Sequence, residues 1–437
     1  MEIKDKLQKL IQDKKSRIAV IGMGYVGLPL ALRFESQGFS VIGIDTDKDK
    51  VKLLNQGSSP IEHIKSSILK KALSRNLSFS SDYKLLSDVE AIIICVPTPL
   101  TKNKEPDLSF VISTMQNLLP NIKSGQIISL ESTTYPGTTE EVLAPMIELG
   151  GFDIGNDFFL VYSPEREDPG NKDFETHQIP KVVSGTTKNC LEVAKILYSA
   201  IVQEIVPVSS PRVAELTKLL ENIYRSVNIG LVNEMKMVAD KMDIDIYEVI
   251  NAASSKPFGF KAFYPGPGLG GHCIPIDPYY LTWKAKEFGM HTRFIELAGE
   301  INESMPKWVI QKTMQALESG KKVLNGSKVL VLGLSYKKDI DDTRESPSVE
   351  LIKLLEDRGA NVDYSDPFVV EFPKMRKYKF ELSSVDINPT NLAKYDVCII
   401  STDHSSFNYS MILKYANLIV DTRGVYKNNS NKKIISA

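Results

Sequence analysis

A thiol at the end of a glycine- and proline-rich segment is the first group in this sequence suited to covalent chemistry. Cys273 ends the densest run of these two residue types, 264–273, and Asp277 follows four residues later beside a proline. Glycines let a ligand approach the backbone, and a thiol presented there acts as a nucleophile when its pKa is lowered. A tight turn that happens to contain a cysteine explains the same residues equally well. His272 adds neither a Cys–His pair nor a metal site, because adjacent side chains generally point apart and no further ligands are evident.

A second set of polar side chains recurs at helical spacing. Lys218, Asn222 and Arg225 fall at i, i+4 and i+7 of a segment, 211–241, whose apolar residues also repeat with a helical period. Such a stripe is usually the solvated face of a helix, and the spacing alone favours that interpretation. In the alternative, the lysine lies at a bound substrate, where it stabilises a developing oxyanion or accepts a proton.

Three glycines near the N-terminus have the spacing of a dinucleotide-binding fingerprint. Gly22, Gly24 and Gly27 lie between a predicted strand and a predicted helix, where they allow a tight turn, approach of a pyrophosphate and close helix–strand packing. Asp45 ends the next strand, where a carboxylate binds the adenosine ribose and repels a 2′-phosphate. Lys50 either pairs with the diphosphate or is a surface charge. The pattern predicts NAD rather than NADP as the cofactor.

Alternating apolar and helical segments must position these groups. Apolar runs predict strands at 17–22, 40–45, 91–96, 126–130, 158–162, 181–185 and 203–208. Their alternation with helices such as 28–38 implies βαβ units and a parallel sheet. The densely charged N-terminal segment, 1–17, is expected to form a short helix.

From residue 211 the pattern changes. One helix is predicted over 211–241, about 45 Å long at 1.5 Å per residue, and others at 246–253, 278–288 and 305–318. A second α/β region follows, with strands at 328–333, 361–365, 396–401 and 418–421 and a helix at 348–358. The polar tail from residue 427 is expected to be loosely ordered.

Composition excludes several classes of protein. The 437 residues include 53 basic and 54 acidic side chains, so no positive excess is present for binding nucleic acid. No segment resembles a secretory signal or a membrane span. The four cysteines are widely spaced without a CxxC pair, which favours a reducing cytoplasm and no metal site. Three of them, Cys95, Cys190 and Cys398, lie in apolar stretches typical of buried, inert thiols.

Six segments in order resemble the UDP-glucose/GDP-mannose dehydrogenase family over essentially the whole chain. They are 22–27, 131–136, 162–166, 214–222, 268–277 and 336–346. Chance explains any one of these motifs but not the set. The resemblance implies an α/β fold with an N-terminal Rossmann-type dinucleotide domain (1–208), a central helical domain with one long helix (209–322) and a C-terminal Rossmann-like UDP-sugar domain (323–437). The long helix, apolar on one face, also predicts a homodimer formed through the central domain.

By this resemblance, the enzyme oxidises the C6 alcohol of a nucleotide sugar to a carboxylate with two NAD⁺. Hydride transfer alone needs no thiol, but a thiohemiacetal on Cys273 can lose a second hydride to give a thioester that water hydrolyses. Lys218 and Asn222 would stabilise the alkoxide and tetrahedral intermediates. Asp277 would orient or activate the water, assisted by Thr133 and Glu165.

The resemblance also assigns binding residues. Those expected to bind NAD are Gly22, Gly24, Tyr25, Val26, Gly27, Asp45, Lys50, Thr98, Thr133 and Arg344. Those expected to bind the UDP-sugar are Glu165, Arg166, Lys218, Asn222, Tyr264, Gly270 and Lys337.

Departures from the family pattern bear on the substrate. Many UDP-glucose enzymes have an arginine about sixteen residues before the cysteine, whereas 255–261 here contains none. Together with the segments 256–260 and 162–171, this favours UDP-N-acetylglucosamine, followed by UDP-N-acetylmannosamine, UDP-N-acetylgalactosamine and UDP-glucose. The product would supply bacterial surface polysaccharide, such as lipopolysaccharide O-antigen or capsule.

Two other functions compete with this one. A two-electron dehydrogenase of the β-hydroxyacid type also joins a Rossmann domain to a helical domain with a Lys/Asn pair, but it needs neither Cys273 nor a second α/β region. A non-catalytic, NAD-responsive binding protein is the alternative from another class.

Overall fold

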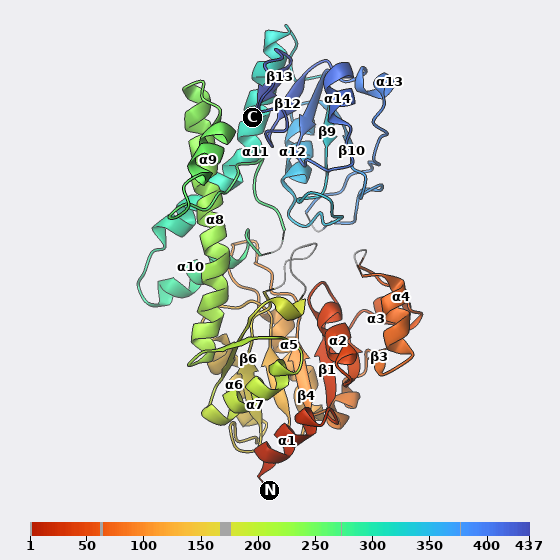
Figure 1. Cartoon of the computed structure of the whole chain (residues 1–437), viewed down its shortest axis with the longest axis vertical. Coiled ribbons are helices and arrows are strands. Elements are labelled where there is room, and N and C mark those ends of the chain that lie inside the picture. Colours follow the sequence, from red (N-terminus) through yellow and green to blue (C-terminus); the bar gives the residue numbers. More distant parts are fainter. Residues whose placement is uncertain (1, 62–63, 167–175, 272, 376) are drawn as a thin grey trace. The chain divides into compact units, whose positions relative to one another are not determined.

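Each of the two predicted α/β regions builds one sheet (Figure 1). The computed structural model describes residues 2–61, 64–166, 176–271, 273–375 and 377–437. The chain divides into two units, Met1–Glu221 with Tyr279–Met290, and Asn222–Pro278 with His291–Ala437. Among the described residues, no helix combines the length and the apolar character that a bilayer crossing requires.

The first unit contains an eight-stranded sheet in the order β3-β2-β1-β4-β5-β6-β7-β8. Its strands are β1 Arg17–Ile21, β2 Ser40–Ile44, β3 Leu77–Ser80, β4 Ala91–Ile94, β5 Ile127–Leu130, β6 Phe159–Tyr162, β7 Lys181–Gly185 and β8 Ile205–Pro207. Its α-helices are α1 Ile3–Gln12, α2 Gly27–Ser36, α3 Lys48–Asn55, α4 Ser66–Leu73, α5 Ser109–Leu118, α6 Ala144–Leu149 and α7 Lys188–Ser199. Shorter helical turns are η1 Tyr83–Asp88, η2 Leu119–Asn121, η3 Thr138–Leu143 and η4 Thr176–Gln178.

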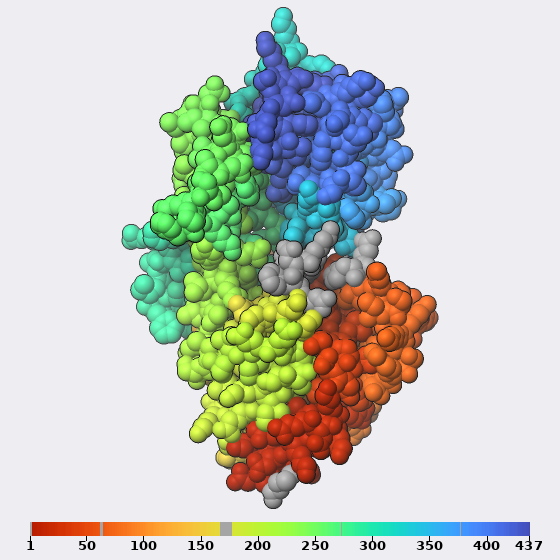
Figure 2. Space-filling model, in the orientation of Figure 1, coloured from red at the N-terminus to blue at the C-terminus, as the bar shows by residue number. Residues whose placement is uncertain are grey.

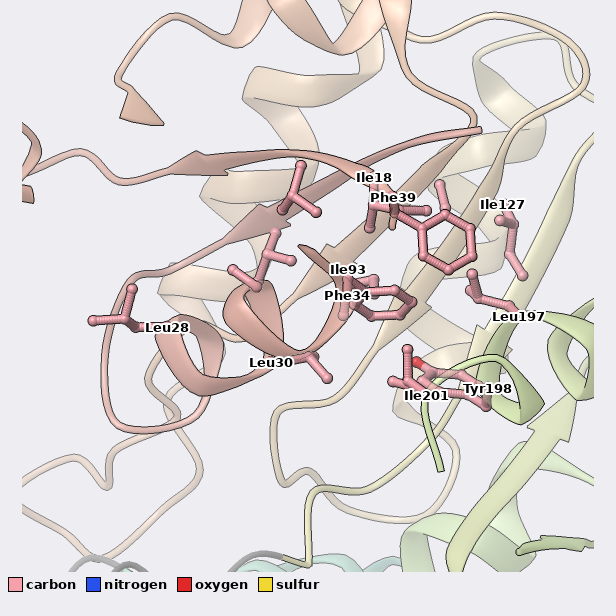
Figure 3. Packing of buried hydrophobic residues seen from close by; sticks show 14 of the residues in the cluster. Ile18, Leu28, Leu30, Phe34, Phe39, Ile93, Ile127, Leu197, Tyr198 and Ile201 are labelled. Atoms are coloured by element: carbon pink, nitrogen blue, oxygen red, sulfur yellow. The ribbon is translucent and has the colours of Figure 1, made fainter. Parts of the chain in front are cut away.

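Both faces of this sheet are buried, because successive side chains of a strand point to opposite faces. Ile18 and Val20 of β1 pack into one apolar cluster with α2 and α7, whereas Ala19 and Ile21 pack into another with α5 and α6. Figure 3 shows part of the first cluster, in which side chains of α2 and α7 meet those of the strands. Burial on both faces explains why these strands read as continuous apolar runs.

The all-parallel sheet expected from the sequence is wrong at one position. β6 and β7 pair antiparallel, with Tyr162 opposite Ser184, whereas the other strand pairs formed by the described residues of both sheets are parallel. A parallel neighbour needs a crossover helix. The described part of the connection, 163–166 and 176–180, contains only the short turn η4. The edge strand β3 was not predicted, because its sequence alternates polar and apolar residues over four positions only.

The second unit contains a five-stranded parallel sheet in the order β10-β9-β11-β12-β13. Its strands are β9 Lys328–Leu332, β10 Asn361–Ser365, β11 Val397–Ile400, β12 Ile419–Asp421 and β13 Ile434–Ser436. The remaining helices are α8 Pro211–Lys241, α9 Ile246–Ser254, α10 Asp277–Glu287, α11 Arg293–Ser319, α12 Pro347–Glu356, α13 Pro389–Leu392 and α14 Tyr409–Tyr415. The helix α8 has the predicted bounds, and α8 and α10 each contribute residues to both units.

Two expectations for this region are wrong. The tail is not loosely ordered: β13 adds to β12 as a parallel strand, and the Ala437 side chain is buried, because two isoleucines extend the sheet. The helix predicted from residue 305 begins at Arg293, so Pro306 lies inside α11 rather than in its first turn, where proline is best tolerated.

Candidate active site

The three fingerprint glycines differ in what surrounds them. Gly22 has a φ of +95°, and a methyl group on it would lie 2.5 Å from the carbonyl oxygen of Cys95. On Gly27, which begins α2, a methyl group would lie 1.9 Å from the Gly22 carbonyl oxygen. No atom of the described residues lies within 4 Å of the corresponding position on Gly24, so this residue leaves open space beside the loop. The residues present therefore fit a dinucleotide whose diphosphate approaches at Gly24.

Asp45 ties the end of β2 to the fingerprint loop. Its carboxylate is buried and accepts hydrogen bonds from the Met23 N–H and the Asp47 N–H, each at 2.9 Å. The Lys50 ammonium also lies 2.9 Å from Asp45 Oδ2 and is half-buried. Lys50 is therefore not a free surface charge, because it pairs with Asp45, the acid expected to bind the ribose.

The other predicted NAD contacts of this unit follow strands or lie in the same loop. Tyr25 and Val26 are half-buried in the fingerprint loop, Thr98 is buried after β4, and Thr133 is half-buried after β5. The carboxyl ends of β1, β2, β4 and β5 lie at one edge of the sheet because these strands are parallel. Ligands of open α/β sheets bind at that edge.

Arg166, a predicted substrate ligand, already has protein partners. Its guanidinium lies 2.7 Å from the Glu221 carboxylate on α8 and donates to the Pro180 carbonyl oxygen at 2.6 Å. The backbone N–H of Arg166 donates to Oε1 of Glu165 at 2.7 Å. Arg166 therefore holds the segment after β6 against α8. The rest of the 162–171 motif, 167–171, lies outside the described residues.

The polar stripe of α8 is not a solvated face at its first two positions. Lys218 and Asn222 are buried, and only Arg225 is exposed. Asn222 Nδ2 donates to Oδ2 of Asp277 at 2.5 Å, and the Asp277 N–H donates to the carbonyl oxygen of Cys273 at 2.9 Å. The structure thus brings Asn222, Asp277 and the cysteine turn together, although 51 residues separate Asn222 from Cys273 in the sequence. His272 lies outside the described residues.

The glycine-rich loop packs against the segment after β9. A methyl group on Gly270 would lie 2.3 Å from Cβ of Tyr336, so only glycine fits there. The Gly271 N–H donates to the carbonyl oxygen of Arg344 at 2.9 Å. Further back in the loop, Tyr264 is half exposed, and its hydroxyl lies 3.1 Å from Asn251 Oδ1.

The remaining predicted ligands lie in that same segment. The Arg344 guanidinium pairs with the buried carboxylate of Asp342, at 2.6 Å, and Lys337 is half-buried. Arg344, predicted to bind the cofactor, therefore belongs to the second unit, whereas the fingerprint lies in the first.

In the second sheet, as in the first, a carboxylate at the end of one strand accepts hydrogen bonds from the loop after the neighbouring strand. This second carboxylate was not predicted from the sequence. Asp366, directly after β10, accepts hydrogen bonds from the N–H groups of Leu334 and Ser335 at 2.6 and 3.0 Å, much as Asp45 accepts from Met23. Burial opposes ionisation of Asp366, but the His404 hydrogen bond and backbone N–H donors hold its pKa below the usual range. The sequence signal that could have revealed this was the order of three features: the strand β9, the glycine Gly333 that follows it, and an acid, Asp366, at the end of the next strand.

No group of three or more His, Cys, Asp or Glu side chains in the described part of the chain could hold a metal ion.

Comparison with known proteins identifies the family. Three family models match the chain: the NAD binding domain of the UDP-glucose/GDP-mannose dehydrogenase family at 16–202, its central domain at 212–304 and its UDP binding domain at 330–428. The chain belongs to this family. It is therefore an NAD-dependent oxidoreductase that acts on a nucleotide sugar, and its UDP binding domain indicates a UDP-sugar. The predicted family, fold class and cofactor are confirmed.

Several relatives are similar over nearly their full length. The chain is 35% identical to UDP-N-acetyl-D-glucosamine 6-dehydrogenase of Pseudomonas aeruginosa, covering 90% of this chain and 92% of that protein. It is 37% identical to Protein CapL of Staphylococcus aureus, with 93% and 96% covered. Among solved structures, the UDP-D-ManNAc dehydrogenase of Pyrococcus horikoshii matches with a TM-score of 0.84 at 33% identity, covering 93% of this chain and 95% of that one.

Proposed function

We propose that this dehydrogenase oxidises the C6 alcohol of a UDP-N-acetylhexosamine, foremost UDP-N-acetylglucosamine, to the uronic acid in two successive hydride transfers. The observation that carries this proposal is that Asn222 donates to the buried carboxylate of Asp277, whose own N–H donates to the carbonyl oxygen of Cys273, so that these two polar side chains adjoin the turn that bears the thiol. The relative from Pseudomonas aeruginosa and the absence of an arginine in 255–261 support the choice of sugar. The product serves surface polysaccharide synthesis in a reducing cytoplasm, the setting that four free cysteines favour.

In this mechanism, NAD⁺ would supply the hydride acceptor for each oxidation when bound. The chain's own residues do the rest. Cys273 attacks the aldehyde, and the thiohemiacetal collapses to a thioester when the second hydride leaves. Lys218 and Asn222 stabilise the oxyanions, since a buried ammonium and amide face little competition from water. Asp277 orients the water that cleaves the thioester, with Thr133 and Glu165 assisting.

We further propose that residues 1–208 bind NAD, 209–322 carry Lys218 and the Cys273 loop, and 323–437 bind the UDP-sugar. The three ranges matched by the family models support this division. The residues that bind NAD and the UDP-sugar are those assigned from the sequence. The open space at Gly24 supports the first set, and the packing of Gly270 on Tyr336 supports the second.

An assay of UDP- and GDP-sugars that counts NADH per sugar consumed tests this function. We expect two NADH per sugar, with the highest kcat/KM for UDP-N-acetylglucosamine. One NADH per sugar would contradict the four-electron reaction and favour a simple alcohol dehydrogenase. If none of the sugars is turned over, the result would favour the alternative function, a non-catalytic, NAD-responsive binding protein. A higher kcat/KM for UDP-N-acetylmannosamine would support the second candidate, which the similarity to the Pyrococcus horikoshii structure favours.

An exposed apolar stripe on α8 supports the proposed homodimer. Exposed side chains follow the helix at intervals of three, four or seven residues: Val213, Leu216, Leu220, Tyr224, Leu231, Met235, Val238 and Met242. Residues of α8 and α9, green in Figure 2, form part of the molecular surface. A stripe with this period along a helix is the surface that a second copy covers in helix–helix packing.

Leu231→Glu is expected to convert the dimer to a monomer at micromolar concentration, because it places a charge in the middle of the apolar stripe. Light scattering measures the mass. Leu149→Glu is the matched control, since Leu149 is 90% exposed and lies outside the stripe. A wild-type chain that is already monomeric, or a Leu231→Glu variant that stays dimeric, would contradict the proposed interface.

A further inference from the structure

A lysine at the start of β7 lies between two carboxylates in the NAD-binding unit. Lys181 Nζ is 2.8 Å from Oε2 of Glu131, directly after β5, and 3.4 Å from Oε2 of Glu165, after β6. The side chains of Lys181, Glu131 and Glu165 are 7%, 0% and 14% exposed. All three groups are thus withdrawn from water, and Glu165 is the most accessible of them.

The antiparallel pairing of β6 and β7 produces this arrangement. Tyr162 of β6 lies opposite Ser184 of β7. Continued three residues past the end of β6, this register sets Glu165 opposite Lys181. A parallel β7 would begin at the other edge of the sheet. The one departure from a parallel sheet therefore brings a cation to the carboxylate that we expect to assist the water.

The far side of the lysine is anchored in the core. Glu131 Oε1 accepts a hydrogen bond of 2.6 Å from the Tyr198 hydroxyl, which also lies 2.6 Å from Ser129 Oγ. Lys181 Nζ lies 5.1 Å from the centre of the Tyr198 ring. Tyr198 itself packs in the apolar cluster of Figure 3 beside Ile201. Glu131 is fixed by these contacts, whereas Glu165 lines a small pocket together with Arg166 and Lys181.

Two carboxylates contact the one ammonium of Lys181 in this network. Burial raises the pKa of Glu131 to about 7, against the opposing effect of Lys181. Burial disfavours the charged form of Lys181, but Glu131 and Glu165 together raise its pKa, so it stays protonated. Burial and the same two carboxylates raise the pKa of Cys95, which stays a thiol. Buried ion pairs often add little stability, so stability alone does not explain this one.

We propose that Lys181 is a positioning residue, whose ammonium, anchored by Glu131, orients the carboxylate of Glu165 and keeps it ionised as a hydrogen-bond acceptor for the reaction. This inference rests on the proposed function, in which Glu165 assists the catalytic water. Among the described residues, the titratable and charged groups that interact with Glu165 include Lys181, Glu131, Cys95 and Arg166, and Tyr198 reaches it through Glu131. Lys181 acts only through Glu165 and needs no contact with substrate.

Two substitutions are expected to shift the pH dependence in opposite directions. In Lys181→Met, Glu165 loses the ammonium that lies between it and Glu131, so the acid limb of the kcat profile moves up by about one pH unit or more. In Glu131→Gln, the ammonium belongs to Glu165 alone, so the acid limb moves to lower pH. Lys181→Arg is expected to restore the wild-type limb. None of the three substitutions replaces a proposed substrate ligand, so we expect kcat and its pH profile to change more than the KM for the UDP-sugar.

Glu35→Gln is the matched control for loss of a buried charge in the same unit. The Glu35 side chain is 2% exposed and pairs with Arg75 at 2.5 Å. We expect it to lower thermal stability without moving the acid limb. Shifts of Lys181→Met and Glu131→Gln in the same direction, or an unmoved limb in a folded variant, would overturn the proposal. If Lys181→Met fails to fold, the Glu131→Gln variant tests the proposal by itself: an acid limb of the kcat profile at lower pH than in wild type supports it, and an unmoved limb overturns it.

The variant Glu165→Gln distinguishes the proposed role of Lys181 from the proposed role of Glu165 in assisting the catalytic water. A slow Glu165→Gln with unshifted Lys181→Met and Glu131→Gln profiles would remove only the role of Lys181. A Glu165→Gln variant as fast as wild type would remove the roles of both residues. The count of NADH per sugar tests the overall reaction independently of either outcome.

Discussion

Cys273→Ala is expected to stop formation of the carboxylate while NAD binding persists. Without the thiol no thiohemiacetal forms, so the aldehyde has no covalent route to the second hydride transfer. We expect the rate of complete oxidation to fall by at least about 1000-fold, the scale seen when a catalytic nucleophile is removed. NADH per sugar should fall from two to at most one. Absorbance of NADH and mass spectrometry of the sugar nucleotide measure both quantities.

Cys398→Ala is the matched control in the same unit. Cys398 is fully buried in β11, and burial raises the pKa of its thiol to about 12, so it offers no thiolate at neutral pH. We expect this variant to retain two NADH per sugar despite some loss of stability from the small cavity. Two NADH per sugar at the wild-type rate from Cys273→Ala would refute the thioester route. That result would also return Cys273 to the role of an incidental turn residue.

The features that the sequence predicts well depend on neighbouring residues. The bounds of α8 agree with the prediction because thirty-one residues with one helical period contain no internal break. The fingerprint is recognisable because the strand, the turn and the helix are contiguous around Gly22 and Gly27. The burial of Lys218 is different, since the spacing of a polar stripe does not reveal whether other parts of the chain cover it.

The features that escaped prediction require residues far apart in the chain. Lys181 meets Glu131 across fifty positions, and only the antiparallel pairing of β7 makes that contact. Asp366 with His404 is similar, because each lies after a different strand of the second sheet. The pairing of Lys50 with Asp45 likewise depends on how the short helix α3 lies against the end of β2. In each case tertiary pairing decides which charges meet, and local sequence does not encode it.

Alanine at the second and third fingerprint glycines is expected to separate cofactor binding from folding. Among the described residues, no atom lies within 4 Å of a methyl group on Gly24, and its φ lies outside the left-handed region, so Gly24→Ala should fold as stably as wild type. The methyl group occupies the space through which the diphosphate approaches the backbone. We expect NAD affinity to fall by about 100-fold, equivalent to about 3 kcal/mol. Isothermal titration measures the affinity and thermal unfolding the stability.

Gly27→Ala should do the reverse. Its methyl group would lie 1.9 Å from the Gly22 carbonyl oxygen and 3.3 Å from Cβ of Cys95, so the first turn of α2 must move away from β1 and β4. Overpacking against backbone costs about 1–3 kcal/mol or more, and we expect the melting temperature of the apoprotein to fall. NAD binding then weakens because the helix N-terminus is displaced. A Gly24→Ala variant that binds NAD like wild type would show that the diphosphate does not approach at this glycine, whatever Gly27→Ala does to stability.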